Sequence, residues 1–180
     1  MDLQEKIVGE KMFHEGKSYK FYTVDVELPN KKIIHRELVK HPGSVAILAL
    51  DSQNRIVMVE QYRFAVQKTL WEIPAGKLDK ISGETPAQGA CRELEEETGF
   101  AADDWIYLGT QYPSPGLVGE IMHMFLARTL TPSKQNLDED EFINVHWISP
   151  DDLRQRIKSG DINDGKTIST FTIAHLKGYI

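Results

Sequence analysis

The sequence predicts a protein of the α/β class. Segments with the composition and alternation of β-strands lie on both sides of a well-capped helix, so strands and helices are mixed along the chain. One strand, residues 44–50, is nearly all apolar, which is expected of a strand covered on both faces of its sheet. The length of 180 residues suits one domain, or one domain with a small extension.

The first predicted element is a β-hairpin. Residues 19–28 form its first strand, a turn follows at Pro29, and residues 32–40 return as the second strand. The apolar residues on one face of the first strand are Tyr22, Val24, Val26 and Leu28. After a break at residues 41–43, further strands are expected at 44–50, 56–63, 105–112, 120–130 and 144–148.

A helix is predicted between residues 85 and 99. Thr85 is a favourable N-cap, Pro86 suits the first helical position, and Gln88 completes a capping box. Gly99 supplies the stop. The apolar residues that fall on one side of this helix are Ala87, Ala90, Cys91 and Leu94, so Cys91 is expected to be a small core residue.

Three acidic residues share the opposite side of the same helix. Glu93, Glu96 and Glu97 lie three and four positions apart, which places their side chains one above another. Like charges so close weaken a helix. The cluster is either a solvated acidic face or a set of oxygen ligands for Mg²⁺ or a similar ion.

The C-terminal part continues the mixed pattern. Residues 136–141 form an acidic loop, a helix starts at Ser149 with Pro150 in its first turn, and a final helix is expected at residues 166–177. The net charge of −6 argues against a nucleic-acid-binding protein but not against an anionic substrate, since metal ions supply positive charge. No apolar run is long enough to span a membrane, no signal peptide is recognised, and a single cysteine demands no oxidising compartment, so a cytoplasmic protein is expected.

The run around the acidic helix resembles the Nudix box, G-x5-E-x7-R-E-U-x-E-E-x-G-U, in which U is a bulky apolar residue. Glu84, seven further residues and the stretch from Arg92 to Phe100 match its second part at every fixed position. Seven residues, rather than five, separate Gly76 from Glu84, which lengthens the loop before the helix. The runs at 61–63 and 71–76 resemble the ADP-ribose pyrophosphatases of this family, which also carry an N-terminal hairpin.

The resemblance implies a fold and an activity. The fold is an α/β/α sandwich around a mixed sheet at residues 43–180, preceded by an antiparallel β extension at residues 1–42. The activity is Mg²⁺-dependent hydrolysis of the diphosphate of ADP-ribose to AMP and ribose 5-phosphate. The alternatives are a Nudix pyrophosphatase for another nucleoside diphosphate sugar, such as GDP-mannose, and a non-catalytic Nudix-like sensor of ADP-ribose.

The resemblance also implies roles for the acidic residues. The metal ligands would be Glu93 and Glu97, with Glu96 a possible third, the backbone carbonyl of Ala75 and Glu141; they would hold two or three Mg²⁺ or Mn²⁺ ions. Arg92 would orient carboxylates. In the acidic loop, Glu139 is assigned as the base and Glu141 as the metal contact, although the reverse assignment and a merely solvated loop stay open.

Substrate contacts and assembly complete the expectations. The residues assigned to substrate binding are Arg36, Arg63, Glu72, Ser114, Gly116 and Glu120, each of which has a solubilising surface role as its alternative. A homodimer is predicted in which the hairpin at 19–40 packs on the partner subunit and Arg36 reaches the partner's active site. The alternative is a hairpin folded back on its own domain.

Overall fold

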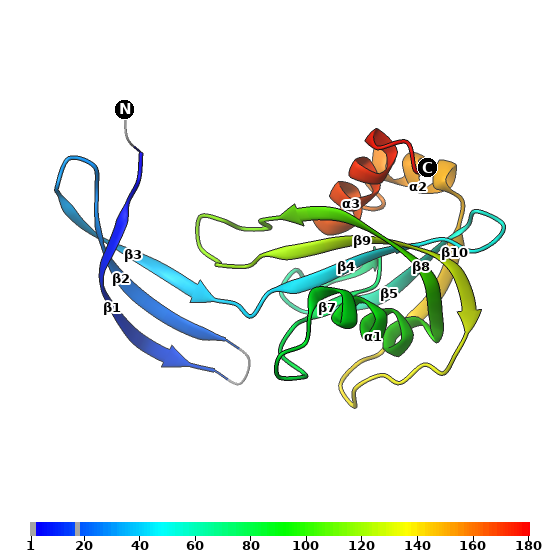
Figure 1. The fold of residues 1–180 in the computed structure, drawn as a ribbon, viewed down its shortest axis with the longest axis horizontal. Helices are drawn as coiled ribbons and strands as arrows, with labels where there is room; N and C mark the ends of the chain where they lie inside the picture. Colours follow the sequence, from blue (N-terminus) through cyan, green and yellow to red (C-terminus); the bar gives the residue numbers. More distant parts are fainter. Residues whose placement is uncertain (1–2, 17–18) are drawn as a thin grey trace. The chain divides into compact units, whose positions relative to one another are not determined.

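The computed structural model describes residues 3–16 and 19–180 and divides the chain into two compact units (Figure 1). The N-terminal unit consists of Met1–Gly43 and Tyr112–Ile121. The second, which we call the sandwich unit, consists of Ser44–Gln111 and Met122–Ile180. In the described ranges, no helix combines the length and apolar character needed to cross a membrane.

The N-terminal unit contains a three-stranded antiparallel sheet in the order β1-β2-β3. Its strands are β1 (Lys6–Glu15), β2 (Lys20–Glu27) and β3 (Ile33–Lys40). The predicted hairpin corresponds to β2 and β3, but the prediction of only two strands is wrong, because β1 pairs along β2 through two register shifts. Val24 and Val26 of β2 are buried on one face, as their alternation indicated.

The loop Tyr112–Ile121 belongs to this unit although it is far away in sequence. The amide of Val39 donates to the carbonyl of Leu117 at 2.9 Å, and the amide of Gly119 donates to the carbonyl of Val39 at 3.0 Å. Val39 and Val118 form a parallel bridge. The loop is therefore attached to β3 through backbone hydrogen bonds.

Two sheets and three helices form the sandwich unit. One sheet has the order β10-β5-β6 and the other has the order β7-β4-β9-β8; β4 and β9 run parallel and the remaining neighbours are antiparallel. The strands are β4 (Ser44–Ala49), β5 (Ile56–Arg63), β6 (Lys68–Glu72), β7 (Ala75–Lys77), β8 (Phe100–Gln111), β9 (Met122–Pro132) and β10 (Asn144–Ile148). The helices are α1 (Pro86–Thr98), α2 (Pro150–Ser159) and α3 (Gly165–Leu176).

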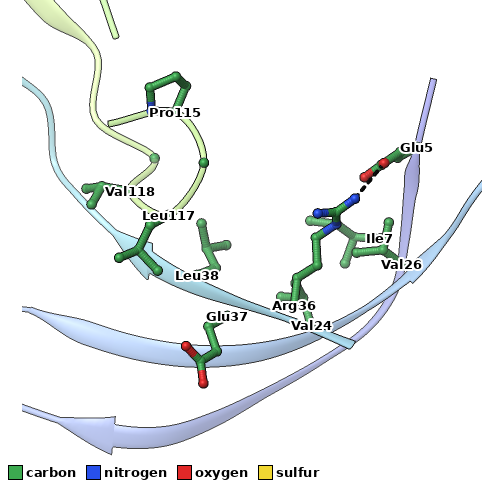
Figure 2. Close-up of a pocket in the computed structure, with 12 residues that line it drawn as sticks. Glu5, Ile7, Val24, Val26, Arg36, Glu37, Leu38, Pro115, Leu117 and Val118 are labelled. Carbon is green, nitrogen blue, oxygen red and sulfur yellow. Dashed lines mark hydrogen bonds and ion pairs between the residues drawn. The ribbon is translucent and has the colours of Figure 1, made fainter. Parts of the chain in front are cut away.

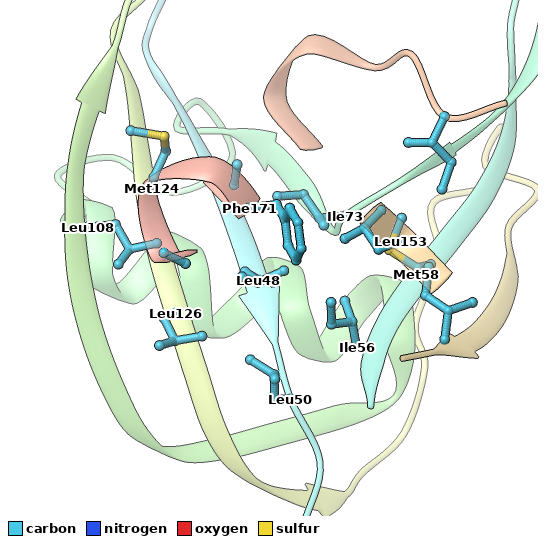
Figure 3. Packing of buried hydrophobic residues seen from close by; sticks show 14 of the residues in the cluster. Leu48, Leu50, Ile56, Met58, Ile73, Leu108, Met124, Leu126, Leu153 and Phe171 are labelled. Atoms are coloured by element: carbon cyan, nitrogen blue, oxygen red, sulfur yellow. The ribbon is translucent and has the colours of Figure 1, made fainter. Parts of the chain in front are cut away.

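Each face of this sheet layer is covered by helices, because side chains alternate along the central strand β4. Leu48 of β4 belongs to a core cluster with Leu153 of α2 and Phe171 of α3 (Figure 3). Ile47, its neighbour, belongs to a second cluster that includes Leu94 of α1. The predicted α/β/α sandwich with a mixed sheet is thus confirmed (Figure 1).

The ends of α1 agree with the sequence in detail. Thr85 caps the helix, the reciprocal hydrogen bonds with Gln88 complete the capping box, and Gly99 ends the helix at a φ of 74°. The expectation for Cys91 is wrong, because this residue is exposed. The buried side of α1 instead includes Glu93 and Glu97 together with apolar residues.

Candidate active site

The short strand β7 and helix α1 form the centre of the candidate site. The amide of Ala75 in β7 donates to Oε2 of Glu97 at 3.0 Å. The next residue, Gly76, lies so close to Glu93 that a Cβ atom there would stand 2.0 Å from the Glu93 carboxyl carbon. Two carboxylates of the helix are therefore placed directly against the strand backbone.

Burial makes these two carboxylates unusual acids. Glu97 is 4% exposed and Glu93 is 9% exposed. Burial, followed by the charge of Glu93, raises the pKa of Glu97 to about 8, and burial also raises the pKa of Glu93 although Arg92 opposes it. A carboxylate removed from water strongly favours a bound proton or a neighbouring cation.

Arg92 connects the carboxylates of α1 to the strand and to the preceding loop. Its guanidinium contacts both carboxylate oxygens of Glu84 at 2.9 Å, Glu93 at 2.7 Å, Glu96 at 2.9 Å and the carbonyl of Lys77 at 3.2 Å. Hydrogen bonds to Glu84 are the main reason that the pKa of Arg92 is raised. Glu84 thus reaches its arginine partner despite the longer loop before the helix.

Lys80 links the longer loop to the acidic loop. Its ammonium group lies 3.1 Å from Glu96 and 2.9 Å from Asp138. The amide of Asp138 donates to the carboxylate of Glu141 at 3.1 Å, and the charge of Glu141 contributes to the raised pKa of Glu97. The structure therefore brings Glu141 into electrostatic range of the buried pair, whereas Glu139 is exposed on the same loop.

Arg63 and Glu72 form a second charged pair in the sandwich unit. Nε and one terminal nitrogen of Arg63 donate to the two carboxylate oxygens of Glu72 at 2.8 Å and 2.6 Å. Although burial alone would raise it, the hydrogen bonds from Arg63 and the charge of Lys166 lower the pKa of Glu72. Hydrogen bonds to Glu72 raise the pKa of Arg63, and the negative charge of Glu97 adds to this effect, so Arg63 lies within electrostatic range of Glu97.

The other predicted substrate residues belong to the N-terminal unit. Arg36 pairs with Glu5 at 2.8 Å and, with Gly116, lines a cavity of about 220 Å³ whose other walls are mainly apolar (Figure 2). Ser114 lies in the loop of this unit, where its carbonyl accepts from two backbone amides. Glu120 lies near the end of that loop. No pattern in the sequence indicated that Glu5 would pair with Arg36.

The donor set of the sandwich unit fits divalent cations such as Mg²⁺. Within the described residues, no group of three or more acidic, histidine or cysteine side chains stands in a ready-made metal-binding arrangement. Arg92 and Lys80 instead contact oxygens of Glu93 and Glu96. Glu97 nevertheless offers a buried carboxylate near Glu93 and Glu141, and hard oxygen donors of this kind suit Mg²⁺ and Mn²⁺.

An α/β/α sandwich with buried carboxylates on one helix, joined by Arg92, is an arrangement that suits a metal-assisted hydrolase. The NUDIX domain model matches residues 40–171. The chain is 44% identical over 177 residues to the ADP-ribose pyrophosphatase of Bacillus subtilis, covering 97% of this chain and 95% of that protein. It is also 44% identical over 168 residues to the methanol dehydrogenase activator of Bacillus methanolicus, covering 92% and 89%.

A solved structure described as an ADP compounds hydrolase has the same fold, with a TM-score of 0.84, 20% sequence identity and full coverage of both chains. The chain belongs to the Nudix family and is a Nudix hydrolase. The predicted resemblance to this family and to its ADP-ribose pyrophosphatases is confirmed. The individual roles of the site residues stay predictions.

Proposed function

We propose that the protein hydrolyses the diphosphate of ADP-ribose to AMP and ribose 5-phosphate with Mg²⁺ or Mn²⁺. The observation that carries this proposal is the buried pair Glu93 and Glu97 held against the backbone of β7. Near-complete coverage of an ADP-ribose pyrophosphatase at 44% identity supports the choice of substrate.

The residues divide the work of the reaction. Glu93, Glu97, Glu96, Glu141 and the carbonyl of Ala75 would hold two or three cations. When bound, these cations would supply positive charge for the oxygens that gain electron density and would lower the pKa of water. Glu139 would accept a proton from the attacking water, whose oxygen forms a bond to one phosphorus. The bond from that phosphorus to the bridging oxygen breaks, and the bridging oxygen leaves with the other phosphate. Arg92 keeps the carboxylates oriented through its hydrogen bonds.

Two sets of residues recognise the substrate. Arg63 contacts the diphosphate. Glu72 acts through Arg63, because Glu72 is 1% exposed and is already paired with the side chains of Arg63 and Lys166. The remaining members of the substrate set are Arg36, Ser114, Gly116 and Glu120. The ion pair between Arg36 and Glu5 must open or be shared when Arg36 contacts the substrate.

A substrate panel tests this function. Purified protein with Mg²⁺ is offered ADP-ribose, GDP-mannose and other nucleoside diphosphate sugars, and the product nucleotides are resolved by chromatography. Equimolar AMP and ribose 5-phosphate from ADP-ribose at the highest kcat/KM is the expected result. Faster hydrolysis of GDP-mannose would favour the first alternative, and binding of ADP-ribose without hydrolysis would favour a sensor.

A second candidate function is activation of a methanol dehydrogenase, which is suggested by the relative named as a methanol dehydrogenase activator. The test adds the wild-type protein or the Glu97→Gln variant to purified methanol dehydrogenase during turnover. Activation by the wild type alone would link the effect to hydrolysis, and activation by both would separate the two. Absence of activation by either removes this candidate.

We further propose a cytoplasmic homodimer in which the hairpin at residues 19–40 packs on the partner subunit and Arg36 completes the partner's site. Its support is the exposed apolar side chains of the N-terminal unit, among them Ile7, Phe13 and Ile33, which an isologous interface would cover twice. Subunits carrying Arg36→Ala are refolded together with subunits carrying Glu97→Gln. If Arg36 serves the opposite site, mixed dimers hold one intact site and activity partly returns. No recovery, or a monomer by light scattering, would contradict the proposal.

A further inference from the structure

The first turn of α3 contacts the chain segment that leads from β6 into β7. Lys166 donates to the buried carboxylate of Glu72, the last residue of β6, and also to Asp164 at 3.0 Å. Asp164 is the N-cap of α3 and accepts from both the amide and the hydroxyl of Thr167. Lys166 and Glu72 are 94 positions apart in sequence, so no local pattern indicates their contact.

Thr167 binds the backbone of the same segment. Its buried hydroxyl oxygen accepts a hydrogen bond from the amide of Ile73 at 2.9 Å. A buried amide that loses its acceptor costs about 1–3 kcal/mol, so this contact fixes Ile73 firmly. Ile73 itself is fully buried in the core cluster that α2 and α3 share with the sheet.

The segment from Ile73 to Ala75 is short and conformationally restricted, so the position of Ile73 affects the position of Ala75 at the carboxylate site. Only Pro74 separates Ile73 from Ala75, and the proline ring fixes one of its two backbone dihedrals. The carbonyl of Pro74 accepts from the amide of Ile47 at 2.9 Å, which anchors the middle of the path to β4. Ala75 then donates to Glu97 at 3.0 Å.

The four charged groups at this point pair with one another. Glu72 receives Arg63 on one side and Lys166 on the other, and Asp164 supplies the second carboxylate for Lys166. Lys166 and Glu72 are both largely buried, at 12% and 1% side-chain exposure. Breaking their ion pair would therefore leave a buried charge without a partner, which is strongly unfavourable. The network therefore holds α3, β5 and β6 in one arrangement.

We propose that Thr167 and Lys166 are positioning residues for the hydrolytic site, acting through Ile73 and Glu72 on the placement of Ala75 and Arg63. The proposal rests on the proposed function, because Ala75 and Glu97 matter only if they surround the cations. It assigns a task to the C-terminal helix, which lies outside the Nudix box.

Metal affinity provides the direct test, using the full-length protein and Mn²⁺ titrations followed by electron paramagnetic resonance. Thr167→Val removes the acceptor but keeps the shape of the side chain, whereas Thr167→Ser keeps the acceptor. Because loss of supporting contacts around metal ligands typically costs 10–100-fold in affinity, we expect Thr167→Val to raise the Mn²⁺ dissociation constant about tenfold or more. Thr167→Ser should stay within about twofold of the wild type.

Thr170→Val is the matched control, because Thr170 is buried in the same helix and its hydroxyl has no hydrogen-bond partner among the described residues. It should bind Mn²⁺ like the wild type, at a temperature at which near-UV circular dichroism shows every variant to be folded. Equal affinities of Thr167→Val and Thr170→Val would overturn the positioning role. Failure of the wild type to bind Mn²⁺ would instead overturn the proposed function.

Lys166 is tested separately, which also decides the matter if Thr167→Val does not fold. Lys166→Met removes the charge and Lys166→Arg retains it. Because Lys166 acts through Glu72 and Arg63, we expect Lys166→Met to raise KM for ADP-ribose more than tenfold with a smaller change in kcat, and Lys166→Arg to restore most of the loss. Unchanged KM in Lys166→Met contradicts its assignment.

Discussion

Replacing Gly76 by alanine should disable the site while leaving the fold intact. The new Cβ would lie 2.0 Å from the carboxyl carbon and one oxygen of Glu93, whereas an ordinary contact needs 3.4 Å or more. The carboxylate must therefore retreat by at least about 1.4 Å, the difference between the two distances. Gly76 does not occupy the left-handed region, so its backbone accepts alanine without strain.

The size of the effect follows from that displacement. A misplacement of about 1 Å in a catalytic arrangement can cost about 100-fold in rate, which corresponds to about 2.7 kcal/mol of transition-state stabilisation. We expect kcat of Gly76→Ala with ADP-ribose and saturating Mg²⁺ to fall at least about 100-fold, while the melting temperature changes by only a few degrees. The stability change is small because the displaced atoms are the far end of a flexible side chain.

Gly165→Ala is the control for this substitution, because a Cβ at Gly165 meets no atom within 4 Å. It should retain wild-type kcat and be slightly stabilised, since alanine favours a helix more than glycine does. Wild-type kcat in Gly76→Ala would refute the reasoning, because Glu93 would then not need its present position. Loss of the native near-UV spectrum would refute the claim that the fold survives.

The remaining predictions concern the pH dependence of stability and the different roles of Glu139 and Glu93. The pKa of Glu97 in the folded protein, about 8, lies above its ordinary 4.5, so the stabilisation by its bound proton is present below pH 4.5 and is lost as pH rises toward 8. In EDTA, the free energy of unfolding from urea titrations should therefore fall between pH 5 and 8 by up to about 1.4 kcal/mol per unit, and excess Mg²⁺ should reduce this slope; a flat metal-free profile contradicts it. Glu139→Gln should lower kcat with nearly unchanged Mn²⁺ affinity, whereas Glu93→Gln should weaken Mn²⁺ binding, and equal loss of metal in both would make Glu139 a ligand.

The sequence was most informative where the controlling interactions are local. The limits of α1 depend on Thr85, Gln88 and Gly99, whose contacts span a few residues, and the structure reproduces them. Strand β1 was missed because KIVGEKMFHE is mostly exposed and shows no apolar alternation; only its pairing with β2 makes it a strand. Strand formation of this kind depends on a partner rather than on composition.

The error at Cys91 has a different physical origin. Grouping residues of α1 by polarity put Cys91 on the apolar, buried side and the glutamates on the opposite side. The helix is instead oriented so that Glu93 and Glu97 are buried with Leu94, because β7 lies against the acidic residues. Polarity predicts burial only where stability alone determines the orientation, and a site that needs buried carboxylates departs from that rule.

The geometry of the site depends on restraints that arrive at β7 from both faces of the sheet. β7 has only three residues and three register partners in β4, so its own ladder restrains it weakly. Helix α1 holds it on one face, where Glu97 accepts from Ala75 and Arg92 donates to the carbonyl of Lys77. Helix α3 belongs to the core on the other face and holds Ile73, two residues before β7, through Thr167. The Nudix box encodes only the first set of contacts. It identifies the chemistry, while further support for β7 comes from Thr167, which lies 94 positions after Ile73.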